Sequence, residues 1–183
     1  TPKREHTMEI VHFMDSTIYL IGPRGAGKTT VGKALSLTLD YRFIDTDDWI
    51  TQKYQQTISS MVQEKGWDFF RQTESEALVQ VSQPNQVIST GGGMILADQN
   101  RAYMKSSGVT IYLRASLETL VKRLSQDPNE AQRPSLTGKT LVSEMNDVLA
   151  KREPLYLQCA DIIVDAGLPI NEIIEAILAK LTK

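Results

Sequence analysis

Five short apolar runs, separated by longer amphipathic segments, constrain the fold of this chain more than any other feature. The runs cover residues 17–21, 42–44, 86–90, 109–113 and 161–164. They are rich in β-branched side chains and apolar at consecutive positions, which is typical of strands buried on both faces of a parallel sheet. Strands that alternate with helical segments predict a three-layer α/β domain, in which helices flank the sheet.

Four of the segments between and after these runs carry helical signals. They cover residues 27–39, 67–81 and 140–156, and a last helix that Pro169 opens. In the last helix, apolar residues recur at helical spacing. These residues are Ile170, Ile173, Ile174, Ile177, Leu178 and Leu181. Because 183 residues is the length of one domain, we assign residues 17–183 to a single domain and residues 1–16 to an N-terminal tail.

Composition excludes several classes of protein. The chain has 20 Lys and Arg and 22 Asp and Glu, and its net charge of −2 argues against nucleic-acid binding. Its single cysteine excludes an intramolecular disulfide and a Cys-rich zinc site. No apolar run approaches the roughly 20 residues that span a bilayer, and the first residues lack the apolar core of a signal peptide. We therefore expect a cytoplasmic monomer that acts on small molecules, without nucleic-acid or membrane partners.

A phosphate-binding motif follows the first apolar run. Residues 22–29 read GPRGAGKT, which matches G-x-x-x-x-G-K-[ST], with a predicted strand before it and a predicted helix after it. In such loops the backbone N–H groups and the helix N-terminus converge on a phosphate. Lys28 is expected to reach the β- and γ-phosphates, and the Thr29 hydroxyl to ligate Mg²⁺. The predicted ATP-binding residues of this loop are Gly25, Ala26, Gly27, Lys28, Thr29 and Thr30.

The rest of the chain favours a kinase over other users of this motif. A GTPase would need a guanine-reading N-K-x-D sequence, which does not occur here. A motor or a helicase would need a much longer chain. A small-metabolite kinase that uses ATP and Mg²⁺ is therefore the preferred class.

Two carboxylates follow the second apolar run. Asp45 and Asp47 are two residues apart, so in an extended chain they face the same side. One could hold Mg²⁺, while the other accepts the proton of an attacking hydroxyl group. The alternative is that these residues cap a helix that starts near Trp49, and we expect Asp47 or Asp48 to cap it in either case.

Three further features point to a ligand at the ends of the strands. Gly91, Gly92 and Gly93 follow the third run and suggest a close approach of backbone to a ligand. Arg152 lies on an apolar helical stripe, so either a protein carboxylate or an anionic ligand must meet its charge. Arg71 has a similar setting, and its alternative role is an ion pair with a carboxylate three residues further on, at position 74.

One segment, residues 125–139, breaks the alternation of strands and helices. It is polar, holds two prolines and a glycine, and shows no periodicity. A loop of this length in a compact domain is often a lid, and the alternative is a passive surface loop. Arg133 lies in this segment, where its alternative is a solvated side chain.

Taken together, these motifs resemble the shikimate kinase family, most closely its second enterobacterial isoenzyme type. The residues that carry the resemblance are GPRGAGKTTVGKALS, FIDTDDWI, Phe70-Arg71, STGGGMIL, Arg133-Pro134 and KREPLY. They occur in the family's order and spacing, from residue 18 to residue 166. A phosphate loop alone would be unspecific, but this combination is specific to the family.

The resemblance implies a nucleoside-monophosphate-kinase-like P-loop NTPase fold with a five-stranded parallel sheet and a mobile lid at about residues 125–139. It also implies ATP-dependent phosphorylation of the shikimate 3-hydroxyl, in chorismate and aromatic amino-acid biosynthesis. The residue roles that it implies are Thr29 and Asp45 for Mg²⁺, Asp47, Arg71, Gly92 and Arg152 for shikimate, and Arg133 for the ATP phosphates. We expect Lys28, Asp47 and Arg133 to be catalytic. Residue chemistry alone leaves open a kinase for gluconate or for a nucleotide, and a non-catalytic ATP-binding module.

Overall fold

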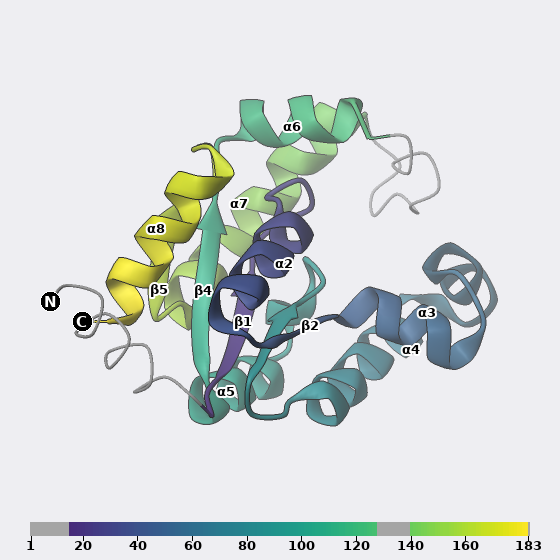
Figure 1. Ribbon diagram of the computed structural model, residues 1–183. Helices are drawn as coiled ribbons and strands as arrows, with labels where there is room; N and C mark the ends of the chain where they lie inside the picture. Colours follow the sequence, from purple (N-terminus) through teal and green to yellow (C-terminus); the bar gives the residue numbers. More distant parts are fainter. Residues whose placement is uncertain (1–14, 128–139, 183) are drawn as a thin grey trace, which may run out of the picture.

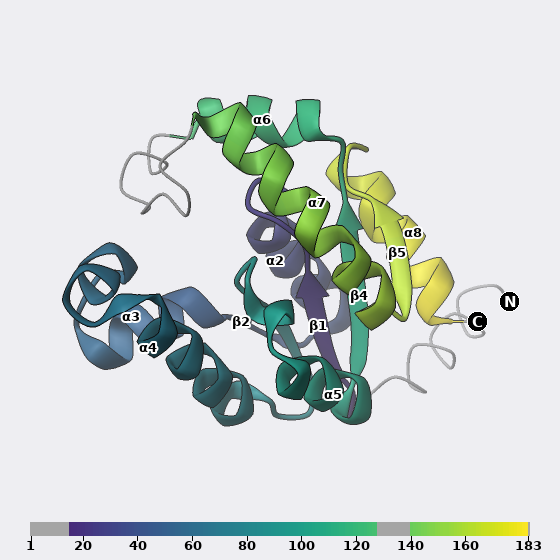
Figure 2. The ribbon, with the colours of Figure 1, turned by 180° about the vertical axis from the view of Figure 1, so that it is seen from behind.

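A computed structural model describes residues 15–127 and 140–182 (Figures 1 and 2). Arg133 and residues 128–139 of the predicted lid lie outside the described residues, and so does the predicted tail up to residue 14. Within the described part, no helix is long and apolar enough to cross a membrane.

The centre of the molecule is a parallel sheet of five strands, as predicted. The strands are β1 (Thr17–Ile21), β2 (Arg42–Asp45), β3 (Gln86–Ser89), β4 (Val109–Arg114) and β5 (Ile162–Asp165). Their order in the sheet is β2-β3-β1-β4-β5, and every neighbouring pair is parallel. The chain leaves β1 toward one edge of the sheet and later returns to fill the other edge. The carboxyl end of β1 is therefore the switch point at which such sheets bind ligands.

Helices connect the strands, and the four predicted ones are present. They are α2 (Lys28–Leu39), α4 (Ile58–Val81), α7 (Leu141–Cys159) and α8 (Ile170–Leu181). The other helices among the described residues are α3 (Thr46–Tyr54), α5 (Asp98–Ser107), α6 (Leu117–Ser125) and the short η1 (Met94–Leu96). The apolar stripe Leu117, Leu120, Val121 and Leu124 could have revealed α6, whereas α5 is short and mostly polar.

Alternate residues of the central strand face the two helical layers. Ile18 and Leu20 belong to a core that includes residues of α2 and α8, and Tyr19 and Ile21 to a second core with residues of α4, α5 and α7. All residues of β1 are buried, which explains why the strand is apolar at consecutive positions. Figures 1 and 2 show these layers on the two faces of the sheet.

The helices α3 and α4 project from the β2 edge of the sheet (Figure 1). They share a small core of their own, formed by Ile50, Met61, Phe70 and Ala77. Gly66 interrupts α4 with a φ of 86°, a backbone conformation that favours glycine, and divides the helix in two. The second half of α4 packs beside the sheet, and the first half continues into the projecting unit.

Candidate active site

The phosphate loop lies where β1 ends and α2 begins, as the motif predicts. Gly27 is the N-cap of α2 and has a φ of 89°, which an L residue rarely adopts. No side chain caps this helix, and its first turn holds no acidic residue. The N–H groups and the positive end of the helix dipole are therefore left to a ligand, and a phosphate suits both.

A cavity of about 300 Å³ opens at this loop, and we call it the phosphate cavity. Lys28 lines it, and its Nζ atom donates to the carbonyl oxygens of Gly22 at 2.5 Å and Pro23 at 3.0 Å. Gly25, Gly27, Thr29 and Thr30 also line the cavity, whereas Ala26 is buried behind the loop. The structure thus brings together all the predicted phosphate-loop residues, with Ala26 beneath rather than at the surface.

Two oxygen atoms that could ligate Mg²⁺ meet in the phosphate cavity. The Thr29 hydroxyl donates a hydrogen bond of 3.1 Å to Oδ2 of Asp45. The described residues contain no group of three or more His, Cys, Asp or Glu side chains that could hold a metal. A single carboxylate and a hydroxyl fit Mg²⁺, because this ion commonly keeps several waters and takes further oxygens from substrate phosphates.

The other oxygen of Asp45 has a structural role that corrects one prediction. Asp45, rather than Asp47 or Asp48, is the N-cap of α3, and its Oδ1 accepts from the backbone N–H groups of both residues, at 2.9 and 3.1 Å. The helix begins at Thr46, earlier than the predicted start near Trp49. An N-cap needs an extended backbone, and Asp45, the last residue of β2, provides it. The Asp47 side chain is therefore not needed to cap this helix.

A second cavity of about 610 Å³ lies beside the first, and we call it the acceptor cavity. Residues of α3, α4 and α7, the phosphate loop and the triple glycine line it. Four residues line both cavities: Arg24, Asp47, Gly91 and Gly92. Asp47 therefore lies at the junction of the two cavities. A chemical group transferred from a molecule in one cavity to a molecule in the other would pass this junction.

The triple glycine lies at this junction because side chains would collide there. A Cβ atom on Gly91 would lie 2.7 Å from Oε2 of Glu74 and 3.0 Å from Oδ1 of Asp47. A Cβ atom on Gly93 would overlap the guanidinium group of Arg71. The glycines thus let charged side chains pack directly against the backbone. The predicted close approach of this backbone to a ligand stays a prediction.

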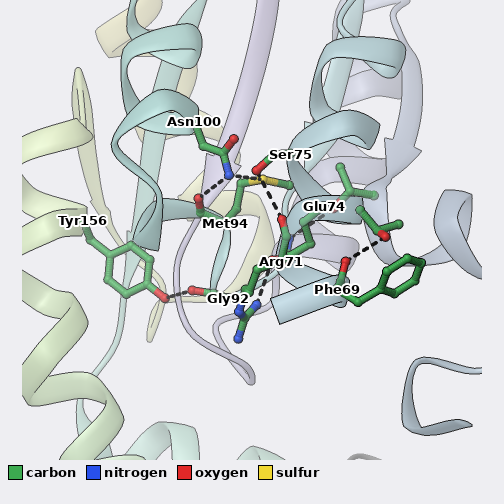
Figure 3. A network of polar contacts seen from close by, with 11 residues as sticks. Phe69, Arg71, Glu74, Ser75, Gly92, Met94, Asn100 and Tyr156 are labelled. Carbon is green, nitrogen blue, oxygen red and sulfur yellow. Dashed lines mark hydrogen bonds and ion pairs between the residues drawn. The ribbon is translucent and has the colours of Figure 1, made fainter. Parts of the chain in front are cut away.

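The two predicted arginines both line the acceptor cavity. Nη1 of Arg71 forms an ion pair of 2.7 Å with Oε1 of Glu74, so the alternative role considered for Arg71 is real (Figure 3). The pair leaves the Arg71 side chain 26% exposed on the cavity, while Glu74 is buried. Arg71 can therefore hold both the buried carboxylate and a ligand, since a guanidinium group has five N–H donors.

Arg152 is the more strongly buried of the two, at 8% exposed. It takes part in none of the ion pairs found within 4.0 Å among the described residues. Burial lowers the pKa of Arg152, and the nearby Tyr156 offsets part of this change. The positive charge of Arg71 lowers the pKa further. A buried cation without a carboxylate partner is costly, and an anion in the acceptor cavity would relieve that cost.

Glu74 is a buried carboxyl group with an unusual pKa. Burial raises this pKa from 4.5 to about 7, the Arg71 guanidinium opposes the rise, and the Asp47 carboxylate adds to it. Between about pH 4.5 and pH 7, folded Glu74 therefore keeps its proton more often than Glu74 of the unfolded chain does, and it is an ion-pair partner of Arg71 only in its ionised form. Between these two values the free energy of unfolding must fall as the pH rises.

Glu74→Gln should remove this pH dependence, because the amide stays neutral. Between pH 5 and pH 8 the stability of the variant relative to the unmodified protein should rise by on the order of 2–3 kcal/mol. Urea unfolding at several pH values measures this difference. Glu76→Gln is the matched control, since Glu76 is exposed on the same helix. A stability difference that is the same at every pH would contradict the assignment.

Two contributors to the site were not predicted. Nη1 of Arg123 in α6 donates to the carbonyl oxygens of Gly25 and Ala26, at 3.1 and 3.3 Å, and so fixes the back of the phosphate loop. The hydroxyl of Thr46, which is fully buried, accepts from the N–H of Gly91 at 3.2 Å. Both bonds join residues more than 40 positions apart, so no local pattern indicates them.

Comparisons with known proteins agree with this geometry. The family model described as shikimate kinase matches residues 24–182. A relative named Shikimate kinase 2, from Yersinia enterocolitica, is 53% identical over 165 residues, which are 90% of this chain and 95% of the relative. The structure of shikimate kinase from Acinetobacter baumannii in complex with shikimate matches with a TM-score of 0.85 at 32% identity, over 93% of this chain and 94% of that one.

A more distant match concerns the fold alone. Deoxyadenosine kinase from M. mycoides, solved with bound dATP, matches with a TM-score of 0.60 at 21% identity, over 91% of this chain and all of that one. The match agrees with the five-stranded parallel sheet and its flanking helices. The predicted P-loop kinase fold is thereby confirmed.

Proposed function

The chain belongs to the shikimate kinase family, and from that premise we propose how its two cavities serve the phosphorylation of shikimate by ATP. The reaction transfers the terminal phosphoryl group of ATP to the 3-hydroxyl of shikimate, in the biosynthesis of chorismate and aromatic amino acids. The phosphate cavity takes the triphosphate of ATP, and the acceptor cavity takes shikimate. The observation that carries this assignment is the position of Asp47, which lines both cavities.

The acceptor cavity offers partners for both kinds of polar group on shikimate. Arg71 and Arg152 line it, and their guanidinium groups suit the carboxylate, since the planar fork can bind two oxygens at once. The hydroxyl groups suit the Asp47 carboxylate and the backbone N–H of Gly92. These four residues are the proposed binding set for shikimate.

In the phosphate cavity, backbone N–H groups and Lys28 hold the β- and γ-phosphates. Thr29 and Asp45 are the proposed protein ligands of Mg²⁺, supported by their 3.1 Å contact. The ion would neutralise charge on the phosphates. Arg133 is proposed to reach the ATP phosphates from the lid on the strength of the family resemblance. The monomeric state likewise stays a prediction.

Asp47 is the proposed general base. It would accept the proton of the 3-hydroxyl as the oxygen attacks the phosphoryl group. Its support is structural: it lies between the cavities, and the N-cap of α3 is Asp45 rather than Asp47.

The test of this function is turnover of a panel of acceptors by the unmodified protein. With ATP and Mg²⁺ present, shikimate should be phosphorylated, and gluconate and nucleoside monophosphates should not. ATP consumption and the phosphorylated product are both measured. Consumption with gluconate but not with shikimate would overturn the proposal, and binding of ATP without turnover of any acceptor would indicate a non-catalytic module.

Arg71→Lys and Arg152→Lys should each weaken shikimate binding by about 1.5–3 kcal/mol, the range for hydrogen bonds to charged groups. Lysine keeps the charge but lacks the fork, so the change is not conservative here. ATP affinity should change much less, because its phosphates lie on the phosphate loop. Calorimetric titration with each ligand separately measures both effects.

Arg42→Lys is the control for these two variants, since Arg42 is exposed on the edge strand β2 and lines neither cavity. If both ligands weaken equally, or if only the melting temperature drops, the arginines are structural ion-pair partners and do not bind shikimate.

A further inference from the structure

Tyr156 lies behind the acceptor cavity, beside two groups that line it. Its hydroxyl donates a hydrogen bond of 2.6 Å to the carbonyl oxygen of Gly92 (Figure 3). The Arg152 guanidinium, one helical turn earlier in α7, is close enough that Tyr156 and Arg152 each shift the pKa of the other. Tyr156 is 1% exposed and lines neither cavity, so it can act on a ligand through these two neighbours but not by touching it.

The hydrogen bond adds a restraint to a segment of flexible residues, whose turn is closed by a bond of 3.0 Å from the N–H of Met94 to the carbonyl oxygen of Gly91. Gly92 is the middle of three glycines, and consecutive glycines have the largest choice of backbone conformations. Gly91 is held by the Thr46 hydroxyl at 3.2 Å, and the carbonyl of Met94 by Nδ2 of Asn100 at 3.0 Å. These bonds hold the ends of the segment from α3 and α5, and Tyr156 holds its middle from α7.

The peptide that Tyr156 holds lies close to the opposite side of the acceptor cavity. Gly92 belongs to the loop after β3, whereas Arg152 belongs to α7, so the two lie on elements that are distant in the sequence. A Cβ atom on Gly92 would lie 3.4 Å from Nη1 of Arg152, which shows how closely the two approach. The Tyr156 hydroxyl holds the Gly92 carbonyl and so fixes one side of this close approach.

We propose that Tyr156 is a positioning residue for the acceptor site, whose hydroxyl holds the Gly92 peptide beside the Arg152 guanidinium at the spacing that shikimate requires. This inference rests on the proposed function, because it takes Gly92 and Arg152 as contacts of shikimate. The rigid support lowers the cost of ordering these groups when the substrate binds.

The chain contains a matched control, because Tyr156 stacks on a second tyrosine. The ring centroids of Tyr112 and Tyr156 are 5.0 Å apart, with an angle of 20° between the planes, and both rings are fully buried. The Tyr112 hydroxyl bonds to Glu153, whose Oε1 pairs with Nε of Arg114 at 2.8 Å. The two tyrosine rings are thus equally buried, but their hydroxyl groups bond to different partners. The Tyr156 hydroxyl bonds toward the acceptor site, and the Tyr112 hydroxyl bonds toward a surface arginine.

The experiment compares Tyr156→Phe with Tyr112→Phe, since each change removes one hydroxyl and keeps the stacked ring. The unmodified protein is first shown to phosphorylate shikimate, which separates a failure of the proposed function from a failure of this inference. For Tyr156→Phe, kcat/KM for shikimate should fall by roughly tenfold, the effect of leaving a buried polar group without its partner. The change should come mainly from a higher KM for shikimate, with KM for ATP within about twofold.

Tyr112→Phe should leave both KM values within about twofold, even if its melting temperature drops as far as that of Tyr156→Phe. Because KM does not depend on the concentration of active enzyme, partial unfolding does not distort the comparison. If Tyr156→Phe is unstable, an excess of ATP analogue raises its folded population, and shikimate binding is measured by calorimetry.

Three results would overturn the inference. The first is an unchanged KM for shikimate in Tyr156→Phe. The second is a KM for ATP in Tyr156→Phe that rises as much as its KM for shikimate, or a KM for shikimate that rises equally in Tyr112→Phe. Either result would indicate general loosening of the core. The third is a Tyr156→Phe protein that stays unfolded with the nucleotide analogue present, which would assign the hydroxyl to folding.

Discussion

Lys28→Ala should lower kcat for shikimate phosphorylation by about 10³-fold or more while the protein stays folded. Negative charge on the transferred phosphoryl group must be neutralised in the transition state, and Lys28 is the cation that the phosphate-loop motif places at the β- and γ-phosphates. In the structure its Nζ atom rests on the carbonyl oxygens of Gly22 and Pro23 inside the phosphate cavity. Steady-state kinetics and a thermal melt measure the two quantities.

Lys33→Ala is the control for this prediction. Lys33 lies on the same helix, is exposed, and lines neither cavity, so its loss removes an equal charge without touching the site. We expect its kcat to stay within about twofold of the unmodified protein, as for a surface change away from any special feature. A Lys28→Ala protein with near-normal kcat would contradict the assignment of this loop to the transferred phosphates.

Asp47→Asn should lower kcat by about 10²–10⁴-fold, the usual contribution of a positioned base. The amide has nearly the same size as the carboxylate but cannot accept the proton of the attacking hydroxyl. ATP affinity should change little, because Lys28 and the backbone of the phosphate loop hold the triphosphate. The melting temperature should also change little, since the side chain that caps α3 belongs to Asp45.

Kinetics, calorimetric titration with an ATP analogue and thermal unfolding together test these expectations. Asp68→Asn is the control, because Asp68 is exposed on α4 and lines neither cavity. If Asp47→Asn lowers stability but keeps kcat per folded molecule, then Asp47 has a structural role and another group accepts the proton.

Much of the fold follows from the sequence, because its signals are local. The five apolar runs predicted the strands to within one residue at either end, since burial on both faces of a sheet requires consecutive apolar residues. The phosphate loop is likewise encoded within eight adjacent residues, where glycines and the start of a helix suffice to form it. The family motifs extended the prediction to the residues that line the two cavities.

The roles of individual side chains were harder to predict from the sequence. The pattern Asp45, Asp47 and Asp48 could not show which residue caps α3, because that depends on where the strand ends and the helix begins. The Arg71–Glu74 pair could be predicted from helical spacing. Its burial, and hence the raised pKa of Glu74, depends on how α4 packs against the triple glycine.

What the sequence determined by itself is therefore the class of the fold, the phosphate loop and the kinds of residue in the site. The tertiary structure alone decided which of them meet. Tyr156 and Gly92 are 64 positions apart, and Arg123 and Gly25 are 98 apart, yet each pair shares a hydrogen bond. These contacts arise because the strand order β2-β3-β1-β4-β5 places β1 between β3 and β4, so the loops after these three parallel strands share one edge of the sheet. Residues of α6 and α7 bond to them there. That order results from the packing of the whole chain, and no local propensity encodes it.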